Sequence, residues 1–193
     1  MGDKKEDIVL LGLTQSQVIL GLVGVAVLVT SAVAISAALA PTTFKKIKIY
    51  HDPTKTECLH FSEIEILDNS GQKVNISKDN IVMSSVYVAE GADKFNKDKI
   101  IDNDGNTIAH TQCGKGESIT ITFDKYTTIS KITILNRYGG NQVRFNGVYI
   151  ALFTEDTIEK CNTQTPKDAT YQKYVYDVID NKLVLNEKDS TKL

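Results

Sequence analysis

Residues 117–153, ESITITFDKYTTISKITILNRYGGNQVRFNGVYIALF, decide the fold class of this chain. Within them, apolar and polar residues alternate in ESITITF, SKITIL and GVYIALF, which is the period of a strand with one buried face. The sequence Gly139-Gly140-Asn141 separates the last two segments and is typical of a turn. We therefore expect three strands joined by turns in this part of the chain.

The same pattern extends outward on both sides of this stretch. Similar alternation occurs in FKKIKIY, HFSEIEIL and QKYVYDV, at residues 44–50, 60–67 and 172–178, and turn residues separate these segments. No convincing helical period follows residue 40. Many short strands with short turns predict an all-β protein with a β-sandwich over residues 41–180, followed by a polar tail at residues 181–193.

Residues 18–40, VILGLVGVAVLVTSAVAISAALA, contain no charged side chain. At about 1.5 Å per residue, a helix of this length crosses a hydrocarbon core of about 30 Å. We expect a single transmembrane α-helix after a short polar segment at residues 1–17. A cleavable signal peptide is the alternative, because Ala38-Leu39-Ala40 resembles a cleavage site. The length of the apolar run and the acidic residues before it favour a retained anchor.

One face of this predicted helix carries a small residue at every fourth position: Ala26, Thr30, Ala34 and Ala38. Such a face lets membrane helices approach closely. Either it meets a helix of another membrane or capsid protein, or the helix is simply rich in alanine and contacts lipid alone. Three lysines at residues 45–48 follow the span and two precede it, which weakly favours a cytoplasmic C-terminal domain.

Composition and motifs exclude several function classes. The net charge is −2 and no block of like charges occurs, so we expect no nucleic-acid partner. The chain contains no H-E-x-x-H, no G-x-S-x-G and no phosphate-binding glycine loop, so we expect a protein without enzymatic activity. Asn75-Ile76-Ser77 is a glycosylation sequon, which matters only if the domain reaches a secretory lumen.

The three cysteines, Cys58, Cys113 and Cys161, lack the C-x-x-C spacing of a metal site. One disulfide with a free thiol and three free thiols are both compatible with their number. Cys58 and Cys161 bracket the predicted domain and are the pair we expect to bridge in an oxidising compartment. Cys113 is expected to be a small buried side chain.

Of the 22 lysine and arginine residues only Arg137 and Arg144 are arginines, and both lie in one short segment. A planar guanidinium forms paired hydrogen bonds that an ammonium cannot form, so this segment requires guanidinium geometry. Two interpretations are open. The arginines bind sugar hydroxyls or a carboxylate, or they brace loops through internal carboxylates such as Asp102 or Asp104.

Several segments, in order, resemble a known family: IKIYHDPTKTECLHFSEIEILDNSGQKVN, SSVY, IIDNDGNTIAHT, and ESITITF through GVYIAL. The order resembles the galactose-binding-like sandwich shared by F-type lectins, or fucolectins, and discoidin or coagulation-factor type C domains. The resemblance covers residues 46–155, and its most specific parts are D-G-N…H-T and I-x-N-R…R-F-N-G-V. It implies an antiparallel jelly-roll β-sandwich whose loops bind sugars, lipid head groups or proteins.

F-type lectins bind fucose through a histidine and two arginines, the arginines lying in an R-x-D-x4-R pattern. The matching positions here are His110, Arg137 and Arg144, and the chain departs from the pattern at Gly139, where the family has Asp. The resemblance implies that these three side chains contact a sugar, and Tyr138 offers an apolar face to its ring. His110 either donates to a ligand hydroxyl or is a structural histidine.

Some relatives bind calcium in a loop like residues 91–106, GADKFNKDKIIDNDGN. The resemblance implies Asp93, Asn96 and Asp98 as ligands, and the alternative is that these side chains are merely solvated. Two functional hypotheses follow. The first is a single-pass membrane protein that presents a glycan-binding module at a cell surface. The second is a structural protein that links a virion membrane to the capsid of a large DNA virus.

Overall fold

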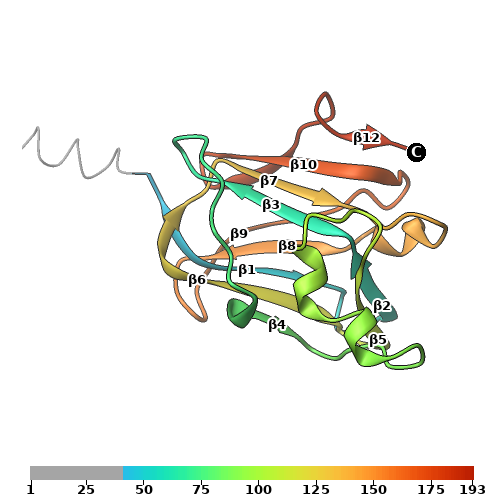
Figure 1. Cartoon of the computed structure of the whole chain (residues 1–193). Helices are drawn as coiled ribbons and strands as arrows, with labels where there is room; N and C mark the ends of the chain where they lie inside the picture. Colours follow the sequence, from blue (N-terminus) through green and yellow to red (C-terminus); the bar gives the residue numbers. More distant parts are fainter. Residues whose placement is uncertain (1–40) are drawn as a thin grey trace, which may run out of the picture. The chain divides into compact units, whose positions relative to one another are not determined.

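The computed structural model describes residues 41–193 of the chain. The predicted polar segment at residues 1–17, the predicted membrane helix at residues 18–40 and its small-residue face at Ala26, Thr30, Ala34 and Ala38 lie outside the described residues. Within residues 41–193, no helix is both long and apolar enough to cross a membrane. This part of the chain is all-β, with antiparallel sheets and four short 3₁₀ turns, as the strand periods predict (Figure 1).

The first large sheet has the order β4-β6-β1-β8-β9. Ile47 and Ile49 of the central strand β1 are fully buried, because alternate residues of a strand face the same side. They lie opposite Ile121 and Ile119 of β6 and continue the same apolar rows into β8. The strands of this sheet are β1 (Thr43–Tyr50), β4 (Ile81–Met83), β6 (Ser118–Thr128), β8 (Tyr149–Phe153) and β9 (Glu159–Gln164).

The second large sheet has the order β11-β10-β7-β3, and β12 also pairs with β10. Its apolar rows run across three strands, since Ile134 of β7 lies opposite both Ile64 of β3 and Tyr174 of β10. The strands are β3 (Glu63–Leu67), β7 (Lys131–Leu135), β10 (Tyr171–Ile179), β11 (Lys182–Leu185) and β12 (Thr191–Lys192).

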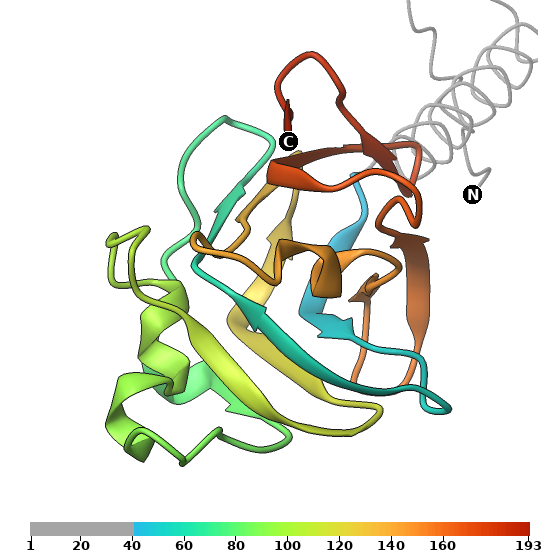
Figure 2. The same cartoon turned by 90° about the vertical axis from the view of Figure 1, so that its right-hand side faces the viewer.

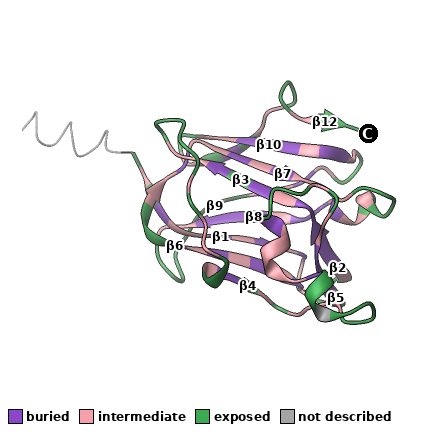
Figure 3. Cartoon of the chain, in the orientation of Figure 1, coloured by how far each residue is buried: buried purple, intermediate pink, exposed green. Residues whose placement is uncertain are grey.

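The two large sheets contribute to one hydrophobic core, in a sandwich-like arrangement. Ile47 and Ile119 from the first sheet belong to the same buried cluster as Ile66, Ile132 and Tyr176 from the second. Figure 3 shows buried residues along the strands of both sheets and exposed residues in most of the connecting loops. Burying each large apolar side chain stabilises the fold by about 1.5–3 kcal/mol, so this shared core holds the sheets together.

The C-terminal residues are part of the fold, and the prediction of a polar tail at residues 181–193 is wrong. Strands β10 and β11 form a hairpin through Asp180 and Asn181, both at positive φ, which is the geometry of a tight two-residue turn. Leu183 is only 6% exposed, so this hairpin covers part of the core. The compact unit therefore spans Thr42–Leu193.

A third, two-stranded sheet pairs β2 (Thr56–Phe61) with β5 (Ala109–Lys115). The predicted strand at residues 60–67 is divided between β2 and β3 at the buried Ser62, so that β2 leaves the large sheet. The turns η1 (Lys78–Asn80), η2 (Ala92–Lys94) and η3 (Lys97–Ile100) precede β5 in the chain. The turn η4 (Gln142–Phe145) packs against β2 (Figure 2).

Candidate ligand-binding pocket

A pocket of about 330 Å³ lies where the small β2–β5 sheet meets η4 and two loops. His110 comes from β5, Arg137 from the loop after β7, and Arg144 from η4. His110 is distant in the sequence from Arg137 and Arg144, yet the fold brings all three to one pocket. Its volume lies at the small end of the range for small-molecule sites.

The pairing of β2 with β5 positions His110, which lies directly opposite His60. The His110 Nδ1 atom lies 2.6 Å from the carbonyl oxygen of Thr111 and therefore donates to it. In the neutral ring this leaves Nε2 as a hydrogen-bond acceptor. Burial lowers the pKa of His110, against the effect of the Thr111 carbonyl, and Arg137 and Arg144 lower it further. The ring is thus neutral at pH 7 and accepts from a ligand hydroxyl rather than donating to it.

The buried amide of Asn136 holds the loop that carries the two arginines. Its oxygen accepts from the Arg137 backbone N–H at 2.9 Å, and its nitrogen donates to the carbonyl of Gln142 at 3.1 Å. Both ends of the loop are therefore tied to one side chain. At the far end, Phe145 is buried edge-on against Phe61 of β2, with ring centroids 5.8 Å apart, and so fixes η4.

Neither guanidinium has a carboxylate partner in the part of the chain that the structure describes. Within residues 41–193, no carboxylate oxygen lies within 4.0 Å of either arginine. Arg137 donates through Nε to the carbonyl of Tyr138 at 3.4 Å, and Arg144 donates through Nη1 to the sulfur of Cys58 at 3.4 Å. Burial lowers the pKa of Arg137, and the nearby charge of Arg144 lowers it further.

This arrangement contradicts the loop-bracing interpretation of the arginines. Asp102 accepts from the hydroxyl of Thr107 and pairs with Lys99 at 3.5 Å. Asp104 accepts from the backbone and side chain of Asn106 at 3.0 Å. Both carboxylates are thus engaged within their own loop, and the guanidiniums remain available to a ligand.

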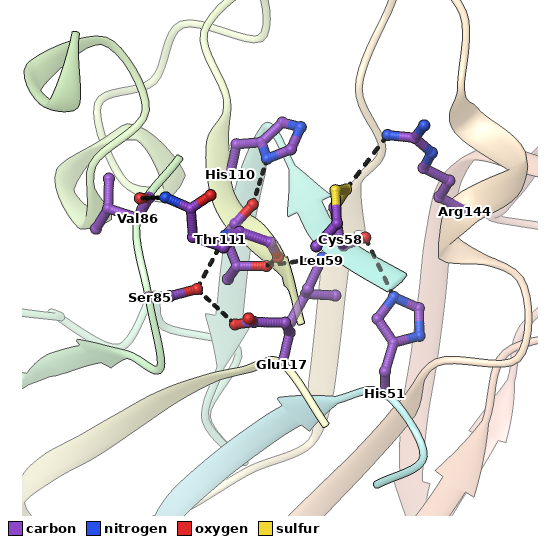
Figure 4. The surroundings of a disulfide bond; sticks show 11 residues. His51, Cys58, Leu59, Ser85, Val86, His110, Thr111, Glu117 and Arg144 are labelled. Carbon is purple, nitrogen blue, oxygen red and sulfur yellow. Dashed lines mark hydrogen bonds between the residues drawn. A yellow bond between two sulfur atoms is a disulfide. The ribbon is translucent and has the colours of Figure 1, made fainter. Parts of the chain in front are cut away.

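A disulfide joins Cys58 of β2 to Cys113 of β5, and both cysteines line the pocket (Figure 4). The predicted pair of Cys58 and Cys161 is therefore wrong. Cys161 is a free, half-buried thiol in β9, where burial raises its pKa to about 11. Cys113 is exposed rather than buried as predicted. Cys58 pairs with Cys113 because the strand register places the two cysteines directly opposite each other.

A hydrogen-bond network attaches the segment before the pocket to β5. The hydroxyl of Ser85 donates to the buried carboxylate of Glu117 at 2.7 Å and accepts from the backbone N–H of Gln112 at 2.9 Å. The side-chain amide of Gln112 donates to the carbonyl of Val86 at 2.8 Å (Figure 4). This network holds the next residue, Tyr87, over His110, with ring centroids 4.7 Å apart.

The apolar side of the pocket was not predicted. Tyr87, Phe95 and Ile108 line it, and Tyr87 packs edge-on against Phe95 with centroids 5.7 Å apart. The SSVY segment that contains Tyr87 was part of the family resemblance and was the available signal. Tyr138, the predicted aromatic contact, does not line the pocket and is 55% exposed. Asn141 lines it instead.

Of the predicted calcium ligands Asp93, Asn96 and Asp98, Asn96 has a local structural role. The side-chain oxygen of Asn96 accepts from the backbone N–H of Asp98 at 3.2 Å and caps η3, whereas Asp93 is exposed in η2. No group of three or more His, Cys, Asp or Glu residues gathers as a metal site among residues 41–193. Calcium binding stays a prediction of the family resemblance. Asn75 of the sequon is exposed.

Comparison of the chain with protein-family models, with curated proteins and with solved structures gives no match.

Proposed function

We propose that residues 41–193 form a non-catalytic, glycan-binding module with the galactose-binding-like jelly-roll fold, tethered to a membrane by residues 18–40. One observation carries the proposal: two guanidiniums and the acceptor nitrogen of His110 converge on a pocket with an aromatic wall, and neither guanidinium has a carboxylate partner among residues 41–193. This combination of donors, an acceptor and an apolar face is what a sugar requires, because its ring has both hydroxyls and a C–H face.

Each part of the pocket has a role in this binding mode. A sugar hydroxyl donates to Nε2 of His110, while Arg137 and Arg144 donate to sugar oxygens. The C–H face of the ring packs on Tyr87. The disulfide and the buried Asn136 amide hold these groups in place before the ligand arrives, which reduces the entropic cost of binding.

The disulfide also supports a location for the module. Disulfides persist mainly in oxidising environments such as cell surfaces and secretory compartments. The Cys58–Cys113 bridge thus supports a module outside the cytoplasm, as glycan recognition requires, and opposes the orientation inferred from the lysines flanking residues 18–40.

Glycan-array binding of the full-length chain in lipid nanodiscs tests the proposal, since glycoside detergents would compete for the site. We expect Arg144→Lys to abolish binding with little change in the thermal midpoint, because a lysine keeps the charge but loses the paired donors. Lys182→Arg is the matched control, since Lys182 is exposed in β11 and does not line the pocket. A folded wild-type protein that binds no glycan would refute the proposal and favour the structural virion role.

A further inference from the structure

The charge of the pocket narrows the class of sugar. Its charged lining residues are Arg137, Arg144 and Glu90. Glu90 forms an exposed ion pair with Lys94, four residues later, and so does not balance the arginines. His110 is neutral. The pocket therefore presents two positive charges that no protein carboxylate within 4.0 Å compensates in the described part of the chain.

The positive charges of the two arginines also act on the buried His60 of β2. His60 is 1% exposed, and burial together with Arg137 lowers its pKa to about 3. Among the described residues, neither of its ring nitrogens has a hydrogen-bond partner. His60 is thus neutral and supplies no counter-charge, and the nearby charge of Arg144 adds to burial in lowering the pKa of Arg137.

The number of N–H donors on the two arginines also favours an anionic ligand. A guanidinium has five N–H donors, and the structure assigns each arginine side chain one hydrogen bond within residues 41–193. Hydroxyls of a neutral sugar satisfy such donors singly and leave the charge in place. A carboxylate or sulfate accepts several N–H groups at once and neutralises the charge.

We infer that the pocket binds a sugar that carries an anionic group, a carboxylate or a sulfate, held by Arg137 and Arg144 while His110 and Tyr87 contact the sugar ring. This inference rests on the proposed glycan-binding function and adds the charge of the ligand to it.

The test uses the full-length chain in nanodiscs of zwitterionic lipid. Isothermal titration compares the methyl glycosides of N-acetylneuraminic acid and glucuronic acid with 3-sulfated galactose, and compares these with the neutral sugars galactose and fucose. We expect at least one acidic sugar to bind about ten-fold or more tightly than either neutral sugar, because a hydrogen bond to a charged acceptor is stronger than one to a neutral hydroxyl. The carboxylate and sulfate arms identify which anion is preferred.

Variants and salt provide independent readouts. Arg137→Gln and Arg144→Gln are expected to remove the preference for acidic sugars, whereas Lys182→Gln, which removes an exposed charge outside the pocket, retains it. For the wild type, raising the salt concentration should weaken the binding of acidic sugars and leave neutral sugars unaffected. The salt series does not depend on the folding of any variant.

The possible failures are distinguishable. If neutral sugars bind as tightly as acidic ones, the inference is overturned and the proposed function stands. If the folded protein binds neither kind, the proposed function itself is overturned. Inorganic sulfate that binds as tightly as sulfated galactose would show that the sugar contributes nothing, and it would overturn the inference as well.

Discussion

Replacing both Cys58 and Cys113 by serine removes the covalent link between β2 and β5. The two cysteines are 55 residues apart in the sequence. In the chain-entropy model, a cross-link over a loop of this length destabilises the unfolded state by about 4 kcal/mol at 25 °C. Since small domains are stable by about 5–15 kcal/mol, we expect the double variant to lose a large fraction of its free energy of unfolding.

Urea denaturation measures this loss. The chain has eight tyrosines and no tryptophan, so tyrosine fluorescence and far-ultraviolet circular dichroism are the suitable signals. The wild type treated with dithiothreitol should unfold at the same urea concentration as the double variant. Cys161→Ser is the matched control, because Cys161 is a free thiol and its replacement removes no cross-link. A double variant within about 1 kcal/mol of the wild type would refute the loop-closure argument.

Two further substitutions test the buried His60 of β2 and the turn between β5 and β6. The pKa of His60 is 6.5 when unfolded and about 3 when folded, so its contribution to stability is complete above pH 6.5 and is lost as the pH falls toward 3. When the pH is lowered from 7 to 5, the free energy of unfolding of the wild type should therefore fall by about 2 kcal/mol more than that of His60→Leu. Urea denaturation at the two pH values measures both losses, and equal losses would contradict the prediction. Gly116 has a φ of +64°, and an added Cβ would lie 3.2 Å from the Pro53 Cα, so we expect Gly116→Ala to cost about 1–2 kcal/mol. Gly71→Ala, also at positive φ but with open space around it, should cost less, and the reverse order would show that crowding by Pro53 is unimportant.

The predicted strands β1, β3, β6, β7, β8 and β10 all bury side chains in the common core. In β3, β7 and the first half of β6 the buried residues alternate with less buried ones, so the period is visible in the residues themselves, whereas β8 and β10 bury consecutive residues. Strand β9 has no buried residue, and β11 and β12 are short. These three segments form strands because they pair with a neighbouring strand, and their own residues do not indicate which strand that is.

Some features of the pocket could likewise be predicted from the sequence, and others could not. The sequence alone singled out Arg137 and Arg144, because guanidinium chemistry is a property of residue type and is scarce in this chain, and the family resemblance implied His110 as their partner. Only the tertiary structure decided the disulfide partner and the acceptor nitrogen of His110, and only it showed that no carboxylate oxygen of residues 41–193 lies within 4.0 Å of either arginine.

The physical reason for this difference is the separation along the chain of the residues that interact. A strand's period and an arginine's donors depend on a residue and its neighbours along the chain. A register such as Cys58 opposite Cys113 depends on how segments 55 residues apart pair within one core. The local pattern of residues 117–153 thus predicts the all-β fold of residues 41–193, and the packing of that fold decides which side chains line its pocket.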